Sequence, residues 1–515
     1  MKFRSRVSAV ALLTAAALAL TACSASDTGT STGSTDGATV TGGTLTIGSL
    51  VDVKSFDPAQ GHIGHDVQYF QPVYDSLLRR EADGTLVPML ATEWKYNDDN
   101  TVLTLTLRDD VTFTDDTKLD AEAVKINLDR FRTGNGPDAS TLAQVSDVAV
   151  ADATTVVITL AQPDPALLDY LGNADGFIAS PTAAAAGALA TDPVGSGPYT
   201  LDQEATVAAS QYTFVKNPDY WDPSLQVYDT IVLKPILDTT AMVNALVSGQ
   251  INAALLTAKT QAQATSAGLT EYQYPTDWQG LLIFDRAGAM VPELADVKVR
   301  QAINYAIDKE TLLAQVGKGL GTVTSQPFGE GNDAFDESLE DAYSYDPAKA
   351  KDLLKEAGVG EFSVTMPTVS GFMDPALTAG VAQNLADVGI TVTWENVAAA
   401  DFRSSLIQAK YAMSWFSLFQ GSPWVAANQI ITPNATYNPF HTTDAKVTEF
   451  VTAIQSGSAD EQKSAALSLN EYVVDEAWFA PFYRPSQIYF TDKATTTKPQ
   501  LQQAVPSIYS YAPAQ

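Results

Sequence analysis

Cysteine and histidine are scarce in this chain of 515 residues, which contains one cysteine and three histidines. A single cysteine excludes any disulfide within the chain, so packing alone must stabilise the fold. The sequence also lacks a Gly-x-Ser-x-Gly elbow, a His-Glu-x-x-His pair and a phosphate-binding loop. These absences leave only carboxylates for catalysis. We therefore expect a protein that is not an enzyme, with a carboxylate-based extracytoplasmic hydrolase as the alternative.

Basic residues are also few. Lysine and arginine total 30 against 60 aspartates and glutamates, which gives a formal net charge of −30 at pH 7. Such a surface repels nucleic acid, so we expect no nucleic-acid partner. The chain is nevertheless 45% hydrophobic, which is enough for a large core, and its length suggests about three domain-sized units.

The N-terminus has the pattern of a bacterial lipoprotein signal peptide over residues 1–22. Three basic residues within the first six are followed by the apolar run Val7–Leu20 and then by Thr21-Ala22-Cys23. This apolar run is shorter than the ~20 residues of a transmembrane helix. We expect Cys23 to be the lipid attachment site, which places the protein on the extracytoplasmic face of the cell membrane. An ordinary secretory peptide, with Cys23 as a bystander, is the alternative.

A flexible tether is predicted over residues 23–42. Between Ser24 and Gly42, 14 of the 19 residues are Gly, Ser or Thr, and almost none has a side chain that could be buried. The folded part should begin near Gly43.

Short strands and capped helices alternate along the rest of the chain, which predicts an α/β fold. Apolar and polar residues alternate at 101–107, 154–160 and 389–397, as in half-buried strands. Asp346-Pro347 and Gly358 bracket a predicted helix at 348–357. A second amphipathic helix is predicted at 298–316, with Asp296 as its cap.

Seven short motifs stand out in the body of the chain. They are Tyr74-Asp75-Ser76-Leu77, Asp83-Gly84-Thr85-Leu86-Val87-Pro88, Ala91-Thr92-Glu93-Trp94, Gly195-Ser196-Gly197-Pro198-Tyr199, Asn217-Pro218-Asp219-Tyr220-Trp221, residues 297–308 and residues 345–350. Together they resemble the motifs of extracellular solute-binding proteins of family 5, the peptide and nickel type receptors of ABC importers. They occur in the order expected for that family, and the resemblance spans nearly the whole chain after residue 43.

This resemblance implies an α/β, two-lobe periplasmic-binding-protein-like fold of the large, three-part kind with two hinge crossovers. The first lobe should comprise residues 43–284, completed by 488–515, and the second lobe residues 285–487. Candidate crossovers are residues 281–288 and 481–490. Closure of such lobes around a ligand is a hinge motion.

The resemblance also implies the function. We expect a monomeric substrate-binding lipoprotein that captures a small solute without a cofactor and delivers it to ABC permease subunits. Peptide-like ligands are the family default, while a neutral oligosaccharide or a metal chelate of the nickel type remain alternatives.

The segment 411–440 is the most informative about the ligand. It has five aromatic residues in its first 14 positions and no charged residue. Its candidate ligand-binding residues are Trp415, Phe416, Gln420 and Trp424, because aromatic faces beside a loop suit ligand stacking. Peptide receptors of the family typically carry an acidic loop after the tryptophan at position 415, and its absence here favours neutral polar ligands.

Other candidate ligand-binding residues lie near the predicted crossovers or early in the chain. Asp57 and Asp277 are candidate acidic partners for a ligand amine. The neighbouring Trp278 and Gln279 are expected to face the cleft near the first crossover. Arg484 suits a ligand carboxylate, with a structural ion pair as its alternative role.

A metal site is not expected. His62 and His65 are three residues apart, but no cysteine and no third imidazole lies near them in the sequence. A solvated loop after Asp57-Pro58 explains the pair more simply than metal-chelate binding does.

Replacement of Cys23 by serine tests the anchor, because acylation requires the thiol. We predict that Cys23→Ser leaves the fold intact and moves the protein from the membrane fraction to the soluble fraction, as measured by cell fractionation. Retention of the serine variant in the membrane fraction would contradict the lipoprotein interpretation.

Overall fold

The structure, a computed structural model, describes residues 41–62, 64–370, 373–419 and 421–514. The predicted signal peptide, Cys23, nearly all of the predicted tether and Gln420 lie outside these residues. Among the residues that are described, no helix has both the length and the apolar character needed to cross a membrane.

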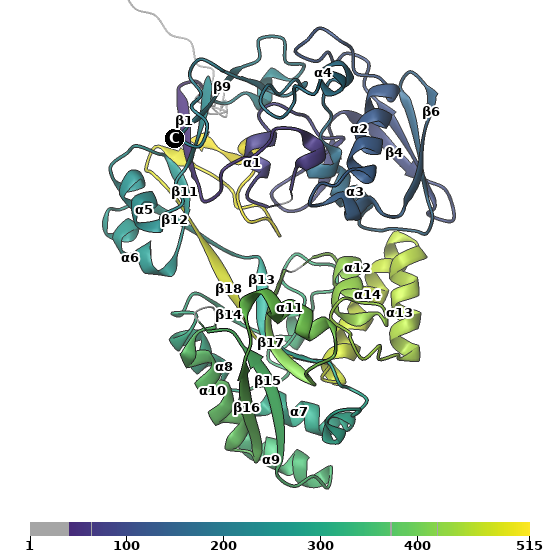
Figure 1. Ribbon diagram of the computed structural model, residues 1–515, viewed down its shortest axis with the longest axis vertical. Helices are drawn as coiled ribbons and strands as arrows, with labels where there is room; N and C mark the ends of the chain where they lie inside the picture. The colour runs from purple at the N-terminus through teal and green to yellow at the C-terminus, as the bar shows by residue number, and fades with distance from the viewer. Residues whose placement is uncertain (1–40, 63, 371–372, 420, 515) are drawn as a thin grey trace, which may run out of the picture. The chain divides into compact units, whose positions relative to one another are not determined.

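A ten-stranded mixed sheet runs through the folded part (Figure 1). Its path is β17-β13-β18-β11-β1-β10-β9-β8, and β12 and β14 pair with β18 beside this path. The strands are β1 (Thr44–Ser49), β8 (Tyr199–Leu201), β9 (Tyr212–Lys216), β10 (Thr230–Pro235), β11 (Ala253–Leu256), β12 (Thr270–Pro275), β13 (Asp277–Ile283), β14 (Gly321–Val323), β17 (Met413–Phe419) and β18 (Phe479–Thr491).

The long strand β18 contributes to two sets of hydrophobic cores. Residues 488–490 pack with the cores around β1 and β11, which we call the first lobe, together with the four-stranded sheet β4-β5-β7-β6. Residues 479–483 pack with the cores around β13 and β17, which we call the second lobe. The four-stranded sheet comprises β4 (Ala91–Tyr96), β5 (Val102–Leu107), β6 (Val145–Asp152) and β7 (Thr155–Leu160).

Three pairs of strands stand apart from these sheets: β2 (Leu78–Arg80) with β3 (Leu86–Pro88), parallel β15 (Phe362–Thr368) with β16 (Ile390–Asn396), and β19 (Thr495–Thr496) with β20 (Ala512–Pro513). The described helices of the first lobe are α1 (Val67–Phe70), α2 (Ala121–Thr133), α3 (Leu167–Leu171), α4 (Pro181–Ala186), α5 (Thr239–Val247) and α6 (Ala258–Ser266). Those of the second lobe are α7 (Val297–Ala306), α8 (Lys309–Gln315), α9 (Pro347–Glu356), α10 (Pro375–Ala386), α11 (Ala399–Ile407), α12 (Pro423–Ala426), α13 (Ala445–Ser456) and α14 (Ala459–Asp475).

Local sequence signals predict several of these elements closely. The three alternating segments form β5, β7 and β16, and α9 begins after Asp346, whose side chain accepts a hydrogen bond from the Lys349 amide. The single helix predicted at 298–316 is wrong, because the structure has two helices there. Asp308 caps α8 by accepting a hydrogen bond from the Thr311 amide, and this cap ends the first helix at Ala306.

One buried carboxylate joins three of the seven sequence motifs. Asp75 is completely buried, and it accepts hydrogen bonds from Ser196 Oγ at 2.9 Å, Tyr220 OH at 2.9 Å and Trp221 Nε1 at 2.8 Å. Burial raises the pKa of Asp75 to about 6, although the three donors act to lower it. The Arg108 guanidinium lies 3.4 Å above the Trp221 ring. Two segments that lie more than a hundred residues farther along the chain thus share Asp75 as their acceptor.

Asp75→Ala should lower the free energy of unfolding by about 3–5 kcal/mol at pH 7.5, because three buried donors lose their acceptor together. Asp75→Asn should cost less, since its amide oxygen still accepts and no charge is buried. Urea unfolding measures both values. Asp147→Ala, at an exposed position of β6, is the matched control and should change stability by less than about 0.5 kcal/mol. Equal stabilities of Asp75→Ala and Asp147→Ala would contradict the assigned role of Asp75.

Candidate functional site

Two neighbouring stretches of chain connect the lobes. The strand β12 ends at Pro275 and β13 begins at Asp277, so the first connection passes through the buried Thr276. In β18, partners change between Pro485, which pairs with β14, and Ser486, which pairs with β12. Gln487 donates a hydrogen bond from its side-chain amide to Thr276 Oγ1 at 3.1 Å, which ties the two connections together.

The first connection therefore lies earlier than the predicted crossover at 281–288. Leu281 and Ile283 are completely buried in a core of the second lobe. The change of partner in β18 falls within the predicted crossover at 481–490.

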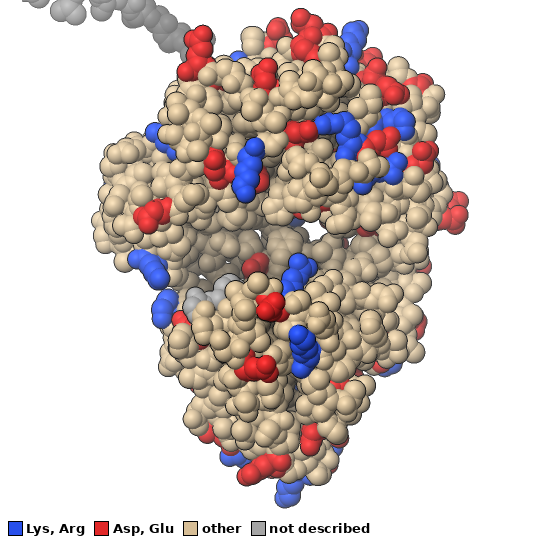
Figure 2. All heavy atoms as spheres, viewed as in Figure 1, with Lys and Arg blue, Asp and Glu red and all other residues tan. Residues whose placement is uncertain are grey.

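A polar cavity of about 280 Å³ lies where segments of both lobes meet. In the space-filling view, the face of the folded part is hollowed between the two lobes (Figure 2). The first lobe contributes the turn between β2 and β3, helix α3 and the C-terminal segment, and the second lobe contributes residues 331–333 and the start of α12. The lining residues are Arg80, Asp83, Gly84, Thr85, Asp169, Gly331, Asn332, Asp333, Ser422, Pro423, Leu501 and Gln502.

The walls of this cavity are held by hydrogen bonds within each lobe. Arg80 donates to the Leu501 carbonyl at 2.5 Å and more weakly to Gln502 Oε1 at 3.4 Å. Asn332 donates to the Gly421 carbonyl at 2.6 Å and accepts from the Ala334 amide. Charged and amide groups thus face the cavity, and among the described residues that line it none is aromatic.

The aromatic segment after Tyr411 is divided between the two faces of β17. Trp415 is 7% exposed and belongs to one core of the second lobe, whereas Phe416 packs on the opposite side against Phe402 and Tyr437. Phe419 at the end of the strand is 41% exposed. Most of the aromatic surface predicted to stack on a ligand is therefore used in packing.

Trp424 is half-buried and belongs to the inter-lobe region. Burial raises the pKa of Asp164 in the first lobe, while a hydrogen bond from the Trp424 side chain lowers it. Ser422 and Pro423, which directly precede Trp424 in the sequence, line the polar cavity. Among the predicted aromatic residues, Trp424 has the placement that best fits ligand contact, and Gln420 lies outside the described residues.

Trp278 and Gln279 occupy successive positions of β13 and face opposite sides. Trp278 is 2% exposed, and its ring packs edge-on against Phe479 with 5.9 Å between the ring centroids. Its side chain is therefore buried in the core. Gln279 is half-buried, opposite Ser417 and beside Tyr483. Burial raises the pKa of the adjacent Asp277, which accepts a hydrogen bond from Ser417 Oγ at 3.4 Å.

The two predicted charged ligand residues are engaged in ion pairs. Asp57 accepts from Arg130 Nη2 at 2.7 Å and caps the turn that follows it through the Ala59 amide. Arg484 is 3% exposed and pairs with Glu340 Oε2 at 2.7 Å. The alternative role of Arg484, a structural ion pair, is the one that its surroundings favour.

The two histidines, His62 and His65, have different surroundings. His62 Nδ1 lies 2.8 Å from Asp138 Oδ1, and this hydrogen bond is the main cause that raises the pKa of His62. Burial lowers the pKa of His65. Over the described ranges, no group of three or more His, Cys, Asp or Glu side chains has a geometry suited to a metal ion.

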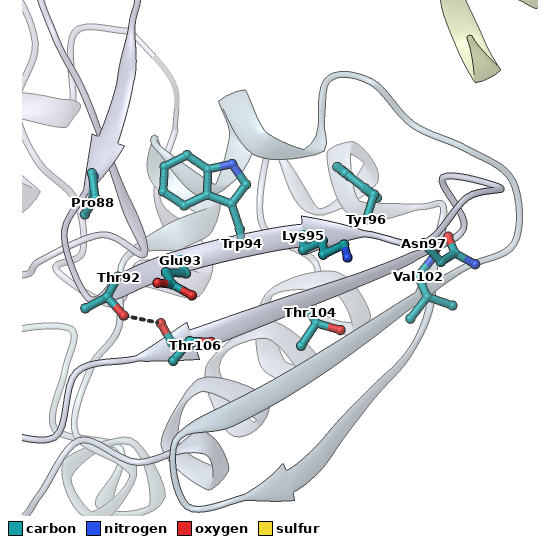
Figure 3. A pocket seen from close by; sticks show the side chains of 10 residues that line it. All are labelled: Pro88, Thr92, Glu93, Trp94, Lys95, Tyr96, Asn97, Val102, Thr104 and Thr106. Atoms are coloured by element: carbon teal, nitrogen blue, oxygen red, sulfur yellow. Dashed lines mark hydrogen bonds between the residues drawn. The ribbon is translucent and has the colours of Figure 1, made fainter. Parts of the chain in front are cut away.

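A larger depression, of about 800 Å³, lies elsewhere, on the four-stranded sheet of the first lobe (Figure 3). Its lining includes Glu93 and Lys95 from β4, and Thr104 and Thr106 from β5. Thr92 Oγ1 donates to the Thr106 carbonyl at 3.1 Å across its floor. No segment of the second lobe takes part, so this depression lacks the two-sided lining that a closing cleft requires.

Sequence reasoning missed Arg80, Asp169, Asn332 and Asp333. One signal for them was present, because Asp83-Gly84-Thr85 belongs to a motif quoted above and forms the turn at the cavity. The other segments are remote from this turn in sequence, and no local pattern marks them.

The described fold and sequence match a known family of binding proteins. The model of the bacterial extracellular solute-binding proteins, family 5, matches residues 85–438. The glutathione-binding protein GsiB of Salmonella paratyphi A is 31% identical over 304 residues. That alignment covers 57% of each chain, so this chain matches somewhat over half the length of the curated relative.

Solved structures of the same fold cover more of the chain. The unliganded open form of the periplasmic murein tripeptide binding protein MppA has a TM-score of 0.82 and 19% identity, and covers 92% of this chain and 98% of its own. NikA from Brucella suis, in complex with Fe(III)-EDTA, has a TM-score of 0.75 and 22% identity, and covers 92% and 100%. The α/β periplasmic-binding-protein-like fold expected from the sequence is thereby confirmed.

Trp415→Ala should destabilise the protein by about 3–5 kcal/mol, because it empties a buried site in the core of the second lobe. Differential scanning calorimetry measures this change. Phe419→Ala, at an exposed position of the same strand, is the control and should shift the melting temperature little. If Trp415→Ala leaves the melting temperature unchanged and weakens ligand binding, the packing role is contradicted and Trp415 contacts the ligand.

Proposed function

Because the chain belongs to family 5 of the bacterial extracellular solute-binding proteins, we propose that it captures a small solute between its two lobes and delivers it to an ABC permease. The family is one of binding proteins, so the carboxylate-based hydrolase considered from the sequence is not the function. The observation that carries the proposal is the polar cavity, which residues of both lobes line.

The connections between the lobes support a hinge. Two adjacent stretches cross. Thr276 links β12 to β13, and Pro485–Ser486 lies within β18, which pairs with strands on each side. Small rotations at these two points would bring the walls of the cavity together. A ligand that contacts both walls binds the closed form more tightly and shifts the population toward it.

The sequence predicts residues 43–284 and 488–515 in the first lobe and residues 285–487 in the second. We propose the same lobes with one change: the first crossover lies at Thr276, so β13 belongs to the second lobe. We further propose that the protein acts as a monomer held to the extracytoplasmic face of the membrane through Cys23. The pattern of the first 23 residues supports this attachment.

Peptide-like solutes are the ligands that the relatives favour. GsiB is named for glutathione and MppA for a murein tripeptide, whereas the NikA structure holds a chelated metal. The polar lining of the cavity fits a charged solute better than a sugar ring that stacks on aromatic side chains. Asp57 and Arg484 are excluded from our proposed contacts by their ion pairs, while Trp424 and Gln279 are retained.

A thermal-shift panel tests the function. The panel contains glutathione, short peptides, neutral oligosaccharides and nickel chelates, each at about 1 mM. A solute with a dissociation constant of about 1 μM would then be present at about 1,000 times that constant, and its binding to the native state would add about 4 kcal/mol of stability. We predict that at least one solute raises the melting temperature and is recovered unchanged by mass spectrometry. Absence of stabilisation across the panel, or recovery of a cleaved product, would contradict solute capture.

A further inference from the structure

The polar cavity contains two opposite charges that have no ion-pair partner. Arg80 is 9% exposed, and among the described residues none of its nitrogens forms an ion pair. It donates hydrogen bonds to the Leu501 carbonyl and to the side-chain amide oxygen of Gln502. Asp169 on α3 is partly buried, and its carboxylate likewise has neither an ion pair nor a hydrogen bond within the described part of the chain. Buried charges of this kind are usually paired.

The two charges influence each other without touching. Burial raises the pKa of Asp169 and lowers the pKa of Arg80, and the field of each charge partly opposes the effect of burial on the other. An arginine and an aspartate that line one cavity and are free to pair within the protein would gain free energy by doing so. Hydrogen bonds to the C-terminal segment instead hold Arg80 in place.

The rest of the lining makes the cavity asymmetric in charge. Asp83 and Asp333 line it together with Asp169, so three carboxylates face a single guanidinium. Asp83 caps the Thr85 amide, and Asp333 lies at the exposed rim, 4.0 Å from Lys463. Ser422 Oγ is buried against the same cavity, and no described residue accepts or donates a hydrogen bond to it. The second lobe thus adds a polar group that still lacks a partner.

We infer that this cavity binds the α-amino-acid head group of the solute, with its ammonium at Asp169 and its carboxylate at Arg80. A guanidinium offers a planar set of donors that matches a carboxylate, and a carboxylate accepts from an ammonium. A head group that carries both charges on one carbon satisfies both side chains at once. Its volume also suits a cavity of about 280 Å³. This inference rests on the proposed function and specifies the ligand class for it.

The same head group occurs in free amino acids and in peptides that are linked through a side-chain carboxyl, as in glutathione. An ordinary linear peptide differs, because its ammonium and carboxylate stand at opposite ends of the chain. The site should therefore distinguish these compounds by the spacing of their charges and not by their net charge alone.

Isothermal titration calorimetry on the full folded chain tests the inference. The probes are the free amino acids, glutathione and trialanine, each also in an N-acetylated and a carboxyl-amidated form. At least one free amino acid or glutathione should bind, and either modification should weaken that binding at least tenfold. Binding by free amino acids alone or by glutathione alone would identify the source of the head group. Failure of every dipolar probe to bind, or equal binding of the blocked forms, would overturn the inference.

Asp169→Asn keeps the shape of the side chain and removes its charge. This variant should weaken binding of the best dipolar probe at least tenfold without lowering the melting temperature of the free protein, because a desolvated, unpaired charge is removed. Asp147→Asn, at an exposed site on β6, is the control and should leave both values unchanged. A lowered melting temperature with retained affinity would assign Asp169 a structural role and overturn the inference.

The two proposals fail in different ways. If a neutral oligosaccharide binds and closes the protein with equal affinity in the native chain and in Asp169→Asn, solute capture stands and the head-group site is wrong. If neither the dipolar probes nor the wider panel of solutes binds, both proposals fail.

Discussion

The pairing of β18 with strands of both lobes is the constraint on which the rest of the structure depends. Its residues 479–485 pair with β13 and β14, and its residues 486–491 pair with β11 and β12. One strand thus belongs to hydrophobic cores of both lobes, and the other connection, at Thr276, is tied to it through Gln487. The two connections lie side by side, while the segments that line the polar cavity lie outside both of them.

The first lobe is organised around a polar centre as well as its apolar cores. The Asp75 carboxylate collects donors from two segments that lie more than a hundred residues farther along the chain. Because a buried acceptor with three donors has few alternative arrangements, it fixes the relative positions of those segments. The turn at Asp83, which lines the cavity, follows this centre by only a few residues, and Arg80 between them is held by the C-terminal segment.

Local patterns in the sequence predicted the strands and helices whose formation depends on residues close by in the chain. The alternation of Leu103, Leu105 and Leu107 gave β5, and the Asp346 cap gave α9. The site was harder to predict, because its residues gain their roles from distant partners. From the sequence alone, Arg484 suits either a ligand carboxylate or a structural ion pair, because its partner Glu340 lies 144 residues away in the chain. Trp415 reads as a ligand platform until the core of the second lobe covers it. One family motif does include residues of the cavity, because Asp83-Gly84-Thr85 forms a turn in its lining. Composition gives no such indication.

The central claim is that a solute closes the two lobes about the paired connections. Small-angle X-ray scattering of the monomer, with and without a saturating amount of the solute that most stabilises it, tests this claim most directly. The account predicts a smaller radius of gyration in the liganded state, because the walls of the cavity approach each other. An unchanged radius of gyration at saturation would contradict it.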